Sequence, residues 1–288
     1  MSSRPLEECV GAFCAFPMQI VHDKTWGYDS QSHSSESLFL SSRLLSPYAV
    51  VPFDMTSPRK IKAARLTSVH YQHPDLAKAA EFLKDFGFYE ARKEDSRIYF
   101  AGFGVEPYVY VAEQSPDSKR HFLGASWTVA SEEDLKLAAL HPNASKIEDR
   151  AGPGGGKIVT ITDPNGLPVS FVYGQQLKDK RVDSEIKLSR EDDGVDQNFA
   201  FEKSRRGKFR RFRAGPSPVH KLGHYGLIVP GSKYKATFDW YTSLMNLKPT
   251  DAVYDPTSGN DKTCFMHVDL GQEYSDHHVS QSCAALGI

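Results

Sequence analysis

The alternation of apolar and polar positions predicts a strand, a helix and further strands, in that order. Residues 66–71 form a β-rich run, and Asp75 after a proline is a typical helix start. Gly87 is expected to end the helix, and β-rich runs follow at residues 97–101 and 107–112. The apolar face of the predicted helix consists of Leu76, Ala79, Ala80 and Leu83.

The same order returns in the next segment. Residues 122–129 predict a strand, and Ser131 stands three residues before Asp134, the spacing of a helix N-cap. Residues 157–162 and 167–173 flank the turn sequence Asp-Pro-Asn-Gly, which predicts a hairpin. The preceding glycine tract leads into a strand and lacks the Gly-Lys-Ser/Thr ending of a phosphate loop. Two βαβββ units therefore fit residues 63–175.

A third copy begins near residue 222. Residues 222–229 predict a strand and residues 264–270 a later strand, while residues 274–278 are expected to open a fourth copy. Only ten residues follow His278, too few for a helix and three strands, so we expect the repeat to be truncated. The apolar face of the intervening helix is expected at Tyr234, Phe238, Tyr241, Leu244 and Met245.

These patterns predict an α+β fold in which tandem βαβββ modules form cup-shaped half-barrels in two domains, the second incomplete. A Ser-rich leader and a charged linker differ from the modules in composition. The linker ends in a basic, Phe-interleaved run that could contact nucleic acid or lipid, but a solvated linker packing on a neighbouring domain is favoured. The expected segments are a leader at 1–62, domains at 63–176 and 218–288, and the linker at 177–217.

Composition narrows the function classes. A formal net charge of -1 over 288 residues leaves no general electrostatic attraction for nucleic acid or an anionic membrane, so a small-molecule substrate is expected. The four cysteines fit neither zinc spacing nor a disulfide framework, which indicates a reducing, cytoplasmic compartment. No apolar run is long enough to span a membrane, and the amino-terminal apolar stretch is a poor signal peptide.

The modular repeat, the Asp-Pro-Asn-Gly-Leu-Pro-Val-Ser-Phe-Val-Tyr module end, and the motifs Gly-His224-Tyr and Asp-His-His278 resemble the vicinal oxygen chelate superfamily over residues 63–280. Within it, the chain is most similar to two-domain extradiol catechol dioxygenases of the metapyrocatechase type. That resemblance implies Fe(II) in the carboxy-terminal domain, held by a His from module three and a His and a Glu from module four. His224 and either His277 or His278 match the histidines, and no residue matches the glutamate.

The residues themselves support such a site. Two histidines and one carboxylate leave coordination positions open on Fe(II) for a diol and dioxygen. Strand side chains alternate, so only one of His277 and His278 is expected to face inward, with His278 favoured. His267 could act as a general acid or base, or be structural. Alone, His224 could be a strand histidine satisfied by a neighbour, and the Asp-His-His triplet an exposed turn.

The amino-terminal domain offers no comparable ligands. Aligning the strands puts Ser68 at the position of His224, Gly124 and Ala125 at the second histidine, and Ser170 at the carboxylate. His70 lies on the same strand face as Ser68 and is expected to be structural. We therefore expect a first domain without metal ligands.

The resemblance implies O2-dependent ring cleavage of a catechol or polyhydroxylated aromatic, with Fe(II) or Mn(II) as cofactor. Because the carboxylate and most of module four are missing, we expect this chain to be inactive or nearly so. A glyoxalase-like enzyme, a degenerate binding protein and a linker-based interaction protein remain alternatives. Assembly into a homo-oligomer is left open.

Overall fold

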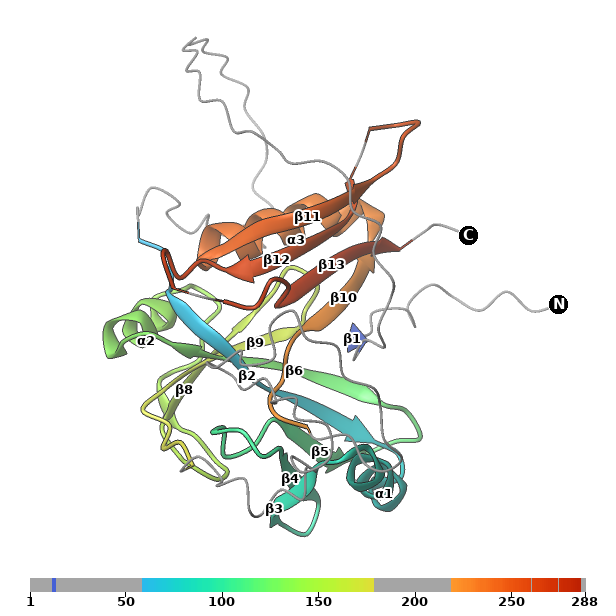
Figure 1. Ribbon diagram of the computed structural model, residues 1–288, viewed down its shortest axis with the longest axis vertical. Helices are drawn as coiled ribbons and strands as arrows, with labels where there is room; N and C mark the ends of the chain where they lie inside the picture. Colours follow the sequence, from blue (N-terminus) through green and yellow to red (C-terminus); the bar gives the residue numbers. More distant parts are fainter. Residues whose placement is uncertain (1–11, 14–58, 179–218, 260, 274, 286–288) are drawn as a thin grey trace, which may run out of the picture.

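The computed structural model describes residues 12–13, 59–178, 219–259, 261–273 and 275–285, which form two β-sheets (Figure 1). The larger sheet has eight strands in the order β3-β4-β5-β2-β6-β9-β8-β7, and the smaller has five in the order β1-β10-β13-β12-β11. Nearly all of the predicted leader and linker, including the basic run, lies outside the described residues.

The eight-stranded sheet consists of two βαβββ modules. In each module the fourth strand pairs parallel with the first, β5 with β2 and β9 with β6, and the modules join where β2 pairs antiparallel with β6. The predicted α+β fold of tandem modules is confirmed. The first module comprises β2 (Ala63–His73), α1 (Leu76–Phe86), β3 (Tyr89–Lys93), β4 (Arg97–Ala101) and β5 (Tyr110–Gln114). The second comprises β6 (His121–Val129), α2 (Glu132–Ala139), β7 (Glu148–Asp149), β8 (Lys157–Thr162) and β9 (Pro168–Tyr173).

Local sequence signals account for the ends of these elements. The Asp75 carboxylate accepts a hydrogen bond from the Lys78 backbone and caps α1, which ends at Gly87 with φ 121°. The Ser131 hydroxyl accepts from the Asp134 backbone and caps α2 in the same way. Asp163 Oδ1 accepts from two backbone N–H groups of the turn that joins β8 to β9. The predicted caps and hairpin are therefore confirmed.

The five-stranded sheet contains the third module. β13 pairs parallel with β10 and antiparallel with β12, as β5 and β9 do in their modules, so it is the fourth strand of this module. We expected this stretch to open a fourth module; such a strand would pair on the other edge of β10, as β6 does on β2. That edge instead pairs with β1 (Ala12–Phe13). The elements are β10 (Tyr225–Pro230), α3 (Gly231–Leu244), β11 (Leu247–Tyr254), β12 (Asp261–Val268) and β13 (Ser280–Ala285).

One hydrophobic core connects the two sheets. It contains buried residues of both sheets together with the apolar faces of α2 and α3. Trp127 of β6 and Tyr225 of β10 are fully buried, with ring centroids 6.0 Å apart in an edge-on arrangement. The Asn246 side chain accepts from the Ala63 N–H at 2.8 Å and donates to its carbonyl at 3.0 Å. The two sheets are therefore held together by apolar packing and by hydrogen bonds between the Asn246 side chain and the Ala63 backbone. Within the described part of the chain, no helix has the length and apolarity needed to cross a membrane.

Candidate metal centre

The face of the five-stranded sheet that points away from the core carries most of the predicted site. Along β12, Cys264, Met266 and Val268 are buried in the core, so the intervening Phe265 and His267 lie on the opposite face. The buried Cys264 thiol is free, and burial raises its pKa to about 12. The opposite face, defined by Phe265 and His267, is called the open face below.

Asp251 of β11 lies between His277 and His278. Its Oδ2 atom accepts from His278 Nε2 at 2.7 Å and lies 3.2 Å from His277 Nε2. The pKa of the Asp251 carboxyl is lowered, first by the hydrogen bond from His278. The ligand atoms of these three residues all lie within 4.8 Å of one another. Two imidazoles and one carboxylate thus converge on one point.

Both histidines contact the carboxylate, whereas strand alternation predicted that only one would face inward. The alternation argument fails because His277 and His278 precede β13 and have no strand conformation. His278 stacks on Phe265 with ring centroids 4.6 Å apart and is 18% exposed, while the His277 side chain is 66% exposed. Their rings are 4.4 Å apart. His278 is therefore the better fixed of the two.

A β-bulge explains how β11 presents two polar neighbours here. The register with β12 shifts between Pro249 and Asp251, so Thr250 is an extra residue. Thr250 Oγ1 donates to the His277 carbonyl at 2.9 Å and lies 2.7 Å from His267 Nδ1. Because the hydroxyl has one hydrogen, His267 Nδ1 must donate to it, which leaves His267 Nε2 as an acceptor. Burial lowers the pKa of His267, which favours this neutral form.

His224 directly precedes β10 and is exposed. Its pKa is lowered, first by partial burial and then by the charge of His278. Among the described residues, the group of three that could share one ion consists of Asp251, His277 and His278, without His224. Tyr225, which follows His224, faces the core.

The three residues fit a divalent transition metal by their donor set. Two imidazole nitrogens and one carboxylate oxygen match the facial triad of non-haem Fe(II) sites. With bonds of about 2.1 Å, neighbouring ligands of one octahedral ion lie about 3.0 Å apart, close to the 2.7 and 3.2 Å seen here. Sequence analysis missed Asp251 because β11 has no clear apolar alternation. The available signal was the repeat, which requires a strand after α3.

The corresponding positions of the eight-stranded sheet hold no such set. Ser68 accepts from Arg150 at 3.3 Å, and Ser170 contacts the Thr160 hydroxyl at 2.8 Å. His70 lies 3.2 Å from a Glu113 oxygen. No group of three potential ligands occurs among the described residues of this sheet.

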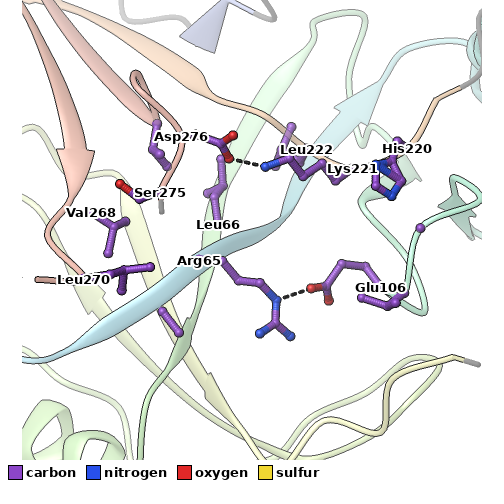
Figure 2. Close-up of a pocket in the computed structure, with 14 residues that line it drawn as sticks. Arg65, Leu66, Glu106, His220, Lys221, Leu222, Val268, Leu270, Ser275 and Asp276 are labelled. Carbon is purple, nitrogen blue, oxygen red and sulfur yellow. Dashed lines mark hydrogen bonds and ion pairs between the residues drawn. The ribbon is translucent and has the colours of Figure 1, made fainter. Parts of the chain in front are cut away.

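A small cavity of about 70 Å³ lies between the two sheets (Figure 2). Arg65 pairs with Glu106 on one wall, and Lys221 pairs with Asp276 on another. Val268 also lines the cavity, and its side chain points to the face of β12 opposite to His267. The cavity therefore lies behind the open face, and the three candidate ligands do not line it.

Solved structures show which known fold the chain resembles. No protein-family model matches the chain, and no curated protein sequence matches it either. The Mn(II)-bound glyoxalase of Novosphingobium aromaticivorans matches with TM-score 0.57 and 16% identity over 78% of this chain and 62% of that one. Homoprotocatechuate 2,3-dioxygenase of Brevibacterium fuscum, in its substrate complex, matches with TM-score 0.57 and 16% identity over 79% and 62%.

The homoprotocatechuate 2,3-dioxygenase of Arthrobacter globiformis matches similarly, with TM-score 0.57 and 16% identity over 81% of this chain and 63% of that one. The chain thus spans less than two thirds of these structures. It shares its fold with these two dioxygenases and with the Mn(II)-bound glyoxalase.

Proposed function

We propose that the open face of the five-stranded sheet binds Fe(II) or Mn(II), and that the protein's activity is extradiol cleavage of an aromatic diol by O2. The convergence of Asp251, His277 and His278 is the observation that carries this proposal. Asp251 supplies the carboxylate for which the family resemblance gave no match. The proposal of an active protein therefore replaces the expectation of inactivity, which rested in part on that missing ligand. His224, whose pKa is lowered by the charge of His278, is available as a further ligand.

A bound Fe(II) or Mn(II) would supply open coordination positions for both diol oxygens and for O2. The chain's own groups would prepare the substrate. Thr250 fixes the His267 tautomer, so His267 Nε2 can accept a proton from a diol hydroxyl. Phe265 limits rotation of the His278 ring by stacking.

The test is anaerobic titration with Fe(II), and separately with Mn(II), followed by calorimetry. We expect one ion per chain, and a loss of affinity of about 100-fold or more in His278→Ala, because a ligand is removed. Asp251→Asn should also weaken binding, since the amide lacks the negative charge.

His121→Ala is the matched control, because His121 forms a comparable pair with Asp117 at 2.9 Å without a third ligand. It should bind the ion as the native protein does. Equal affinity in all four proteins, or no stoichiometric ion in any, would overturn the metal proposal.

The Mn(II)-bound glyoxalase among the similar structures favours one alternative, a glyoxalase-like isomerase. O2 uptake separates the two reactions, because ring cleavage consumes O2 and isomerisation does not. With the metal bound and 3,4-dihydroxyphenylacetate as substrate, the ligand of one similar dioxygenase structure, the proposal predicts O2 uptake. Metal binding without O2 uptake, but with turnover of a hemithioacetal, would support the isomerase instead.

A further inference from the structure

The face of the eight-stranded sheet that carries Ser68, called the inner face below, holds a buried guanidinium. Arg150, in the loop between β7 and β8, is 6% exposed. Its Nη2 donates to Ser68 Oγ at 3.3 Å, and its Cζ atom lies 4.4 Å from the centre of the Tyr108 ring. Its Nη1 is buried without a hydrogen-bond partner. An arginine stays charged in proteins, so this is a desolvated cation with an unused donor.

The nearby carboxylate is already engaged. Glu106 is 4% exposed, and it pairs with Arg65 through one oxygen and accepts from Thr67 Oγ1 at 2.8 Å through the other. In the described part of the chain, no ion pair includes Arg150. Glu106 is thus the ion-pair partner of Arg65, and the positive charge of Arg150 has no carboxylate paired with it among the described residues.

An uncompensated buried charge is costly, and buried donors are nearly always satisfied by protein, water or a ligand. Two other buried polar atoms, close in the fold to Thr67 and Arg65 of β2, also have no partner. Thr128 Oγ1, on the face of β6 opposite Trp127, is one. The Gln175 amide contacts Thr67 at 3.4 Å and leaves Nε2 unpaired. A buried guanidinium with an unused N–H and no paired carboxylate indicates a site for an anion with acceptor oxygens.

We propose that the inner face of the eight-stranded sheet binds a small carboxylate through Arg150, with Ser68 and Tyr108 holding the guanidinium in place. The planar fork of arginine matches the two oxygens of a carboxylate. Ser68 occupies the position that corresponds to His224, so the amino-terminal domain would bind an anion where the carboxy-terminal domain has a candidate metal ligand.

The test measures the melting temperature while acetate replaces chloride at constant sodium concentration, without added metal. The native protein should show a saturable rise, and Arg150→Met should show none. Arg92→Met is the matched control: Arg92 also lies over a tyrosine ring, 4.9 Å from the centre of Tyr99, but is 42% exposed. It should behave as the native protein does.

Arg150→Lys keeps a charge and the aliphatic stem, and decides the question if Arg150→Met fails to fold. Without the fork, its apparent acetate affinity should fall about tenfold or more. An unchanged melting temperature in the native protein would overturn the proposal, because chloride or water would then satisfy Arg150 equally well. An equal rise in native protein and Arg150→Lys would overturn it as well.

Discussion

The two sheets are built from the same module but differ in the polar side chains on one face and in how far these side chains are buried. In the eight-stranded sheet, β2 pairs with β6 over most of its length, and Ser68 and Arg150 are buried at 3% and 6% exposure. In the five-stranded sheet, the corresponding edge of β10 pairs with two residues, and the His277 side chain is 66% exposed. Pairing of two modules therefore encloses a polar face, whereas a single module leaves it open.

The register of the strands supports the comparison of individual positions. Ser68 precedes Val69, the first residue of β2 registered with β5, and His224 precedes Tyr225, the first residue of β10 registered with β13. The same position thus carries a serine that contacts a guanidinium in one module and the imidazole of His224 in the other. The fold places equivalent positions at the same point of each module, and the side chain at that position determines what it can bind.

The largest expected effect tests whether the two sheets unfold as one unit. Trp127→Ala should lower the free energy of unfolding by about 3–5 kcal/mol, because the indole packs against residues of both sheets. Urea unfolding, followed by circular dichroism and by hydrogen exchange, should show both sheets destabilised together. Phe82→Ala, at a 60% exposed aromatic of α1, is the control. Destabilisation of only one sheet would mean that the two domains unfold independently.

A smaller effect concerns pH. Burial lowers the pKa of His73 from 6.5 to about 4, so between these values the unfolded chain binds a proton that the native one does not. Stability should therefore be highest above pH 6.5 and fall as the pH drops to 4, with a loss of about 3 kcal/mol from this residue. Urea unfolding of His73→Gln should show a flatter dependence, while His121→Gln should follow the native curve. Parallel curves for His73→Gln and the native protein would contradict this assignment.

The smallest effect distinguishes the helices of the modules. α1 has a side-chain N-cap at Asp75, whereas the N-cap residue of α3 is Pro230, which makes no side-chain cap hydrogen bond. Asp75→Ala should cost about 1 kcal/mol, measured by the urea midpoint. Ser232→Ala, in the first turn of α3, should change it by much less. If Asp75→Ala loses as little stability as Ser232→Ala, α1 is held by tertiary packing and not by its cap.

The features that sequence predicted correctly depend on local chemistry. The caps at Asp75 and Ser131 and the turn at Asp163 act through neighbouring backbone groups, so their residue types are sufficient signals. Asp251 and the role of β13 depend on long-range pairing. Strand alternation gave the wrong orientation at His277 because it assumed a strand that begins only at Ser280.

The most direct test of the central claim is proton NMR of the histidine ring signals during addition of substoichiometric Mn(II), whose paramagnetism broadens nearby nuclei. The account predicts that His277 and His278 broaden first, that His224 and His267 follow, and that His70 and His73 of the other sheet stay sharp. Broadening that starts at His70 or His73, or that affects all 11 histidines equally, would contradict a metal centre on the open face.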